Sequence, residues 1–164
     1  YELYRFFDVE NIIRIGSAGA ISDQLELRDI VAGISAHTNS NFASQYHLPG
    51  SFAPTADFTL LSTATEAAKE LGHPLKVGSL LSSDTFYDDD ENALHQWAKM
   101  GTLAVEMEAA GLYLNAARLG KRALALVTIS DKPFTGEATT PEERQTTFTQ
   151  MMEIALQTAV KMHG

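Results

Sequence analysis

Residues 123–131 read Ala-Leu-Ala-Leu-Val-Thr-Ile-Ser-Asp, an apolar run that ends in a serine and an aspartate. An unbroken run of this kind is typical of a strand buried on both faces, whereas a half-exposed strand would alternate polar and apolar residues. Such strands occur in sheets that helices cover on both sides. This stretch therefore predicts an α/β fold, with Ser130 and Asp131 where the buried strand ends.

Strand-like and helix-like patterns alternate along the rest of the chain. Apolar runs predict strands at 26–37, 75–81, 102–105 and 121–130, and a strand that runs into a Gly/Ser turn within 11–20. Apolar periodicity and following glycines predict helices at 1–7, 57–71, 92–100, 106–119 and 141–163. The intervening segments, among them 38–55 and 132–139, are predicted loops, and none separates two domains. We expect a single domain, residues 1–164, in which helices cover a mostly parallel or mixed sheet.

The predicted C-terminal helix has a capping signal at its start, whereas the predicted N-terminal helix has none. Residues 140–143 read Thr-Pro-Glu-Glu, a capping box with proline at the first helical position, so the last helix should begin at 141. At the other end, Leu3, Phe6 and Phe7 share a helical face, but no capping residue precedes them. Because a helix seldom begins without a cap, we expect this chain to be cut from a longer one.

The composition excludes several classes of protein. The 164 residues carry 12 Lys and Arg against 21 Asp and Glu, a net charge of −9, whereas nucleic-acid binders need clustered cations. No cysteine is present, which excludes a disulfide scaffold and a thiol nucleophile. The five histidines lack metal-ligand spacing, so we expect no metal. No apolar run reaches ~18 residues and no secretory leader is evident, which predicts a cytoplasmic protein without membrane contact.

Arg14 is the first residue that a structural role alone does not explain. It interrupts the apolar run Ile-Ile-Arg-Ile just before Gly-Ser-Ala-Gly at 16–19, and a buried guanidinium is costly unless an anion meets it. We expect a turn at the glycines, whose N–H groups and Ser17 hydroxyl could hold phosphate oxygens. Arginine suits phosphate because it donates two parallel hydrogen bonds. The alternative is an arginine that faces solvent from an edge strand.

Glu106 and Glu108 lie in an otherwise apolar run, 104–111. A spacing of two directs them to opposite sides of a strand, or about 200° apart on a helix, so we expect only one to face a given pocket. One carboxylate could hold the vicinal hydroxyls of a sugar. The alternative is that one acid is solvated and the other stabilises a helix N-terminus.

Asp131 and an aromatic pair complete the candidate residues. An acid at the end of a buried strand tends to lose hydration, and a carboxyl group that keeps its proton near neutral pH can act as a general acid. A local turn with Ser130 is the alternative. Phe86 and Tyr87 could stack on a flat ring, although aromatic residues more often pack in a core. The acidic run 88–91 is predicted to be a solvated loop.

Five stretches, taken together and in order, carry a resemblance to a known family. They are Ile-Ile-Arg-Ile-Gly-Ser-Ala-Gly-Ala (12–20), Ser-Ser-Asp-Thr-Phe-Tyr (82–87), Val-Glu-Met-Glu-Ala-Ala-Gly (105–111), Ile-Ser-Asp (129–131) and Glu-Arg-Gln-Thr-Thr-Phe (143–148). The combination resembles the nucleoside phosphorylase-I family, and most closely its hexameric, bacterial-type purine nucleoside phosphorylases.

The resemblance implies a role for each matching residue. The implied catalytic residues are Asp131 and Arg144, the implied phosphate-binding residues are Arg14, Ile15, Gly16 and Ser17, and the implied nucleoside-binding residues are Phe86, Glu106, Met107, Glu108 and Ser130. Asp131 would protonate N7 of the leaving purine, and Arg144 would move toward it to assist. Glu108 would receive the 2′ and 3′ hydroxyls of the ribose, and Phe86 would stack on the base.

The same resemblance implies a fold, a reaction and partners. The fold would be a three-layer α/β/α sandwich with a central mixed sheet. The reaction would be reversible phosphorolysis of purine ribo- and deoxyribonucleosides, with phosphate as co-substrate and no metal or organic cofactor. The other partners would be further copies of the chain, in a homohexamer built as a trimer of dimers. The match covers the C-terminal two-thirds of a family member, so the N-terminal residues of the phosphate site are expected to be missing.

Three alternatives remain open at this stage. A uridine phosphorylase would share Ser-Asp-Thr-Phe-Tyr at 83–87, but Asp90 and Asn92 stand where that group would place Gln and Arg. A methylthioadenosine/S-adenosylhomocysteine nucleosidase would share Met-Glu and Ser-Asp, but it uses water and would not need Arg14. An inactive nucleoside-binding fragment would bind ligand without turnover.

Overall fold

Six strands form one mixed sheet in the computed structural model, which describes residues 1–163 and, for 145–147, the backbone alone. They are β1 (Asn11–Ala20), β2 (Ile30–Thr38), β3 (Leu75–Ser82), β4 (Ala104–Glu106), β5 (Arg122–Lys132) and β6 (Glu137–Ala138). Their order is β1-β4-β3-β2-β5-β6. The pairs β1–β5, β2–β3 and β3–β4 are parallel and the others antiparallel, as a mixed sheet requires.

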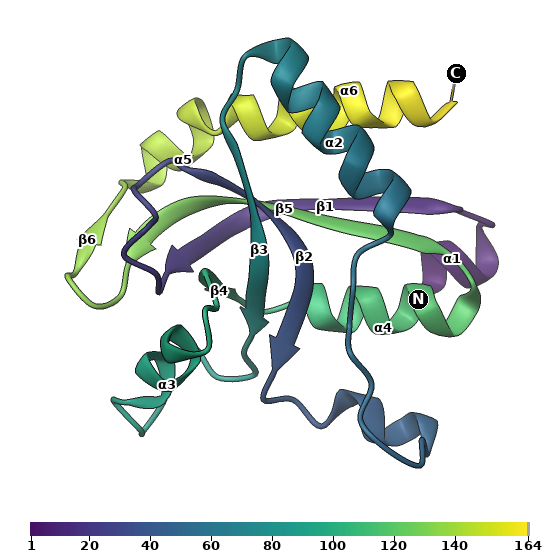
Figure 1. The fold of residues 1–164 in the computed structure, drawn as a ribbon, viewed down its shortest axis with the longest axis horizontal. Coiled ribbons are helices and arrows are strands. Elements are labelled where there is room, and N and C mark those ends of the chain that lie inside the picture. Colours follow the sequence, from purple (N-terminus) through teal and green to yellow (C-terminus); the bar gives the residue numbers. More distant parts are fainter. Residues whose placement is uncertain (164) are drawn as a thin grey trace.

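The sheet curls further than a flat central layer would. β1 pairs with β5 along its length and also with β4 at Gly19 and Ala20, so β1 to β5 close into a partly formed barrel (Figure 1). A register shift between Ala18 and Gly19 lets β1 bend from one partner to the other. The expected α/β class and mixed sheet are confirmed, but the arrangement is barrel-like instead of a three-layer sandwich.

The described residues also form six α-helices and one 3-10 helix. They are α1 (Glu2–Phe6), η1 (Phe42–Tyr46), α2 (Phe58–Leu71), α3 (Ala93–Lys99), α4 (Ala109–Leu119), α5 (Pro141–Thr147) and α6 (Thr149–His163). Figure 1 shows α2 and α6 crossing one side of the sheet and α4 the other. Two apolar cores result, one beneath α4 and one beneath α2 and α6.

Helix ends follow the sequence signals closely. Gly72 and Gly120 end α2 and α4 in the left-handed conformation that favours glycine. The capping box is present, because the Thr140 side chain accepts from the Glu143 N–H and Glu143 accepts from the Thr140 N–H. The predicted helix 141–163 is nevertheless two helices, since the chain breaks at Phe148, whose side chain is buried.

The N-terminal helix buries a different face from the one predicted. Leu3, Phe6 and Phe7 are exposed, whereas Tyr4 is buried and its hydroxyl donates to the Arg122 carbonyl oxygen at 2.7 Å. Burial of Tyr4 raises the pKa of its phenol group. A helix of five residues has little more than one turn. A single polar contact is therefore enough to determine which side of α1 faces the sheet.

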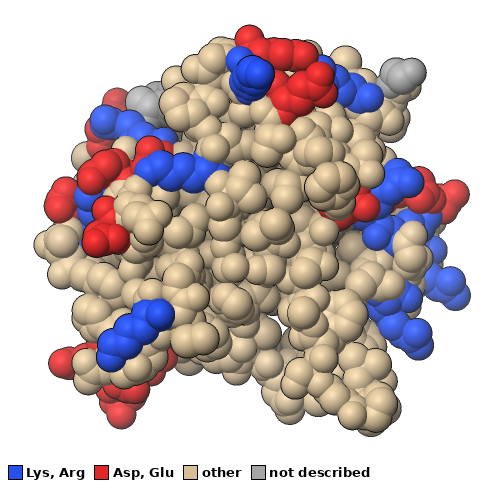
Figure 2. Space-filling view, in the orientation of Figure 1, with Lys and Arg blue, Asp and Glu red and all other residues tan. Residues whose placement is uncertain are grey.

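The surface charges lie at the margins of the view in Figure 2, and the centre of that face is uncharged. None of the helices in the described residues is long and apolar enough to cross a membrane.

Candidate active site

Arg14 lies beside two carboxylates at the start of α4. Its Nη2 forms an ion pair with Glu108 and lies 3.5 Å from Oε2 of Glu106. Its Nη1 is buried and has no hydrogen-bond partner within the described residues. The side chain as a whole is 20% exposed. An unsatisfied, buried, charged donor is costly unless an anion completes it.

The glycine-rich stretch of β1 is strand and not the expected turn. β1 continues through Ala20 because the chain pairs with β5 throughout and with β4 at its end. Only the β5 edge is paired over 11–18, so some backbone N–H groups there have no strand partner among the described residues. Gly16 lets the arginine fold back over the strand, since a Cβ at position 16 would lie 2.7 Å from Nη1 of Arg14.

The other two phosphate-binding candidates on β1 differ in placement. The exposed Ser17 makes no side-chain hydrogen bond within the described residues. Ile15 contributes to an apolar cavity of about 430 Å³ between β1 and α6. Alternation along a strand directs both side chains to the face opposite Arg14.

Glu106 is buried and holds the N-terminus of α4. Its side chain is 1% exposed and accepts from the N–H groups of Glu108 at 2.9 Å and Ala109 at 2.9 Å, as well as from the Ser82 hydroxyl. Ser82 Oγ in turn accepts from the Ala110 N–H at 2.8 Å. A carboxylate is favourable at a helix N-terminus, so this is the structural alternative that the sequence had left open.

Replacing Glu106 with Gln should destabilise the fold. The amide has one accepting oxygen in place of two and carries no charge, so the side chain would lose its attraction to the N-terminus of α4 and to Arg14, at a cost of about 1–3 kcal/mol. The free energy of unfolding from urea denaturation measures this. Glu91→Gln, an exposed loop change, is the control and should have little effect. Equal stability of the two variants would show that the carboxylate does not hold the helix.

Both acids of 104–111 approach Arg14, contrary to the expectation that one alone would face a pocket. Neither regular period applies, because β4 ends at Glu106 and α4 begins at Ala109. Glu108 is the N-cap residue of α4, and its side chain is 58% exposed, so it remains open to a ligand. The intervening Met107 is also exposed.

Asp131 lies at the end of β5, opposite Gly19 of β1. Oδ1 accepts from the Ser130 hydroxyl at 2.6 Å, as the local-contact alternative predicted. Oδ2 has no hydrogen bond within the described residues, and a Cβ at Gly19 would lie 3.0 Å from it. Gly19 therefore leaves room beside the free oxygen of a half-buried carboxyl group.

Arg14 and Asp131 both lie beside β1, at different points along the strand. The Arg14 guanidinium lies over Gly16, and Asp131 lies beside Gly19. Three residues of strand span about 10 Å. That separation suits a ligand with an anionic group at one end and a hydrogen-bonding group at the other. The carboxylates of Glu106 and Glu108, near Arg14, would face the middle of such a ligand.

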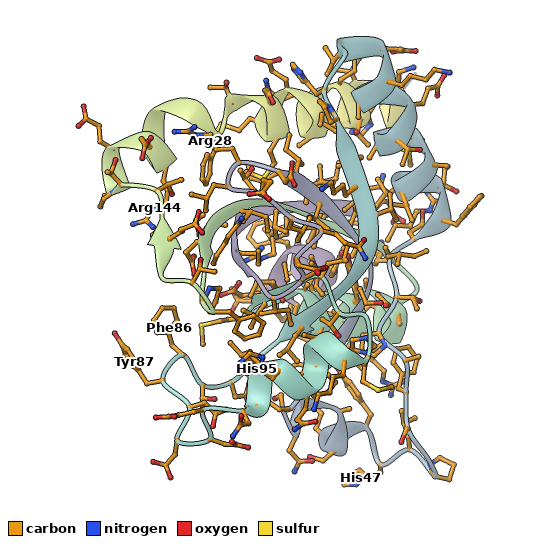
Figure 3. The ribbon with its side chains drawn as sticks, turned by 60° about the vertical axis from the view of Figure 1, so that its left-hand side comes forward. Arg28, His47, Phe86, Tyr87, His95 and Arg144 are labelled. Carbon is orange, nitrogen blue, oxygen red and sulfur yellow. The ribbon has the colours of Figure 1, made fainter. Side chains whose placement is uncertain are left out.

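Phe86 and Arg144 stand apart from this edge. Figure 3 shows Phe86 and Tyr87 projecting from the loop before α3, and Phe86 is 77% exposed. Arg144 belongs to α5, and within the described residues its side chain makes no hydrogen bond or ion pair with Asp131. The structure thus brings Arg14 together with Glu106 and Glu108, but leaves Ile15 and Ser17 on the other face of β1 and does not bring Arg144 to Asp131.

Two further residues bear on the site but had no predicted role. Ser82 was quoted within the motif 82–87, yet its link to Glu106 required the pairing of β3 with β4. Arg28 forms an ion pair with Glu143 of the capping box and so ties the start of α5 to the loop before β2. Donation from the Thr140 N–H lowers the pKa of the Glu143 carboxyl, and Arg28 adds to this.

Comparisons with known proteins agree on one family. The model of the phosphorylase superfamily matches residues 2–162. The DeoD-type purine nucleoside phosphorylase of Clostridium perfringens is 50% identical over 161 residues, which are 98% of this chain and 68% of that protein.

Two solved structures share the fold. A P. knowlesi homologue of P. falciparum PNP matches with a TM-score of 0.79 and 26% identity, over 94% of this chain and 62% of that one. Purine nucleoside phosphorylase from Toxoplasma gondii, solved with immucillin-H, matches with a TM-score of 0.86 and 21% identity, over 96% and 65%. The chain thus spans about two-thirds of the length of these relatives. It belongs to the phosphorylase superfamily and, within it, to the DeoD-type purine nucleoside phosphorylases.

Proposed function

We propose that this chain catalyses the reversible phosphorolysis of purine ribo- and deoxyribonucleosides, giving the free base and the sugar 1-phosphate. The observation that carries the proposal is the buried Nη1 of Arg14, which has no partner within the described residues and lies beside two carboxylates. A phosphate ion would complete this donor. The similarity to DeoD-type purine nucleoside phosphorylases supports the same reaction.

At the phosphate end, Arg14 would hold two groups at once. Its Nη1 would donate to a phosphate oxygen while Nη2 remains on Glu108. Glu108 would thereby be fixed next to the phosphate, and its second oxygen could accept hydrogen bonds from the ribose hydroxyls. The bond between C1′ and the base nitrogen breaks as a phosphate oxygen bonds to C1′, and the carboxylates favour the positive charge that develops on the sugar.

At the base end, Asp131 would supply the proton. The departing purine takes the bonding electron pair, and a proton delivered to N7 neutralises it. The Ser130 hydroxyl occupies Oδ1, which leaves Oδ2 as the oxygen able to carry that proton. General-acid assistance typically contributes about 10²–10⁴-fold to the rate.

Arg144 and Phe86 would complete the site by movement. α5 is separated from α6 at Phe148, so the short helix that carries Arg144 could shift toward Asp131 without α6. The exposed Phe86 would cover the purine ring. No metal or organic cofactor is proposed.

The alternatives are less well supported. In the loop before α3, Asp90 accepts from the Asn92 N–H at 2.9 Å, and Asn92 is the N-cap residue of α3. Asp90 therefore has a local structural role, and neither residue supplies the Gln and Arg of a uridine phosphorylase. A nucleosidase, which uses water, would leave the free nitrogen of Arg14 without an anion.

The homohexamer that the resemblance implies stays a prediction. The exposed apolar side chains of Phe6 in α1, of Phe7 directly after it and of Leu156 in α6 are compatible with burial in an assembly.

Phosphate dependence of base release is the deciding experiment. The longest natural reading frame that contains this segment would be mixed with inosine or adenosine, and free base would be followed by absorbance with and without phosphate. We expect release only with phosphate. Release in water alone would assign the chain to the nucleosidases, and nucleoside binding without release would make it a binding module.

A further inference from the structure

Helix α3 is attached to the rest of the protein mainly through two stacked ring pairs. None of its residues is buried. Trp97 stacks on His37 of β2 with ring centroids 5.6 Å apart. His95 stacks on Phe134, with centroids 3.9 Å apart and planes within 8° of parallel. Since little apolar area holds α3, these two pairs supply much of its fixation.

The His95–Phe134 pair joins the two segments that flank the base end of the proposed site. His95 lies in the first turn of α3, directly after the loop that carries Phe86 and Tyr87 (Figure 3). Phe134 lies three residues after Asp131, in the turn between β5 and β6. The stack therefore links the loop that would cover the purine to the strand end that would protonate it.

Of the two segments joined by the His95–Phe134 stack, the turn that carries Phe134 is held by more backbone hydrogen bonds. β5 and β6 pair at Asp131 and Lys132, and the N–H groups of Thr135 and Gly136 both donate to the Lys132 carbonyl oxygen. The turn is thus held at a fixed place relative to Asp131. By contrast, Phe86 and Tyr87 are almost wholly exposed and contact each other edge to face. The position of their loop depends on its ends, and one of those ends is α3.

We propose that His95 and Phe134 are positioning residues, which hold the Phe86 loop across from Asp131 and thereby set the affinity for the nucleoside but not for phosphate. The proposal rests on the proposed function, because it assigns a role within that site. Neither residue needs to touch the substrate. Nothing in the similarity to known proteins assigns them this role.

The first test measures kinetics in the full natural chain. Phe134→Ala and His95→Ala should each raise KM for inosine about two- to tenfold, with kcat and the KM for phosphate unchanged. Because the rings act on each other, the double variant should be no worse than the poorer single variant. Phe134→Tyr keeps the ring and should restore the wild-type KM. Phe42→Ala removes another partly exposed ring, in η1, and is the matched control.

The second test reports on α3 without using activity. Hydrogen exchange of peptides covering 93–99 should be faster in Phe134→Ala than in the wild type or in Phe42→Ala. Unchanged exchange would overturn the link, and faster exchange with an unchanged KM for inosine would overturn the positioning role. An equal rise in both KM values would also contradict it. A wild-type chain without phosphate-dependent release would instead remove the proposed function, a failure seen before any variant is made.

Discussion

Arg14→Gln should lower kcat/KM for phosphate by about 10²–10³-fold, the loss typical of removing one preorganised charged donor from a reacting anion. The variant removes the buried Nη1, which is the donor free to bind phosphate. KM for the nucleoside should change less, through loss of the contact by which Arg14 fixes Glu108 beside the ribose. Steady-state kinetics with phosphate and inosine varied separately would measure both.

Two companion variants sharpen the Arg14 experiment. Arg14→Lys keeps the charge but not the paired donors, so it should recover only part of the loss. Arg118→Gln removes an exposed arginine from the end of α4 and should leave the kinetics unchanged. The fold should survive in Arg14→Gln, because Glu106 keeps its backbone donors. An unchanged KM for phosphate in a folded variant would refute the role of Arg14.

Asp131→Asn should reduce kcat for ordinary purine nucleosides by about 10²–10⁴-fold, because an amide cannot deliver the proton that the leaving base needs. A nucleoside already methylated at N7 provides the sharper comparison. Its base leaves without protonation, so its kcat should fall little in the same variant. The two substrates, assayed side by side with wild-type and variant enzyme, separate proton donation from simple positioning.

The control for the Asp131 experiment is Asp23→Asn, an exposed aspartate in the loop after β1, which should behave as the wild type. If both kinds of nucleoside lose the same factor in Asp131→Asn, the residue holds the substrate or the fold and does not donate the proton.

Much of the secondary structure was predictable because it depends on local patterns. The apolar run at 123–129 predicted β5, and Gly72 and Gly120 predicted the ends of α2 and α4. The break at Phe148 was not predictable from local signals, because neither glycine nor proline occurs in 142–163. It depends on burial of Phe148 against the second core.

For the site residues, too, the sequence predicted some features and could not predict others. The sequence identified Arg14, Glu106, Glu108 and Asp131 as unusual, since charged residues within apolar runs need a partner or a ligand. It could not show which carboxylate serves structure. Glu106 and Glu108 both reach Arg14, 94 residues away from Glu108, only because β4 pairs with the end of β1 and α4 starts at once.

The sequence by itself determined the α/β class, the capped and glycine-ended helices, the family and the residues whose chemistry needs explaining. Only the tertiary structure shows that β1 pairs with β5 and that the Glu106 carboxylate accepts hydrogen bonds from the N-terminus of α4. It also shows that Nη1 of Arg14 has no hydrogen-bond partner within the described residues. The physical reason is the sequence separation over which each kind of interaction acts. Propensities and caps act over a few neighbouring residues, whereas strand pairing and burial join residues from distant parts of the chain and decide which polar groups are satisfied.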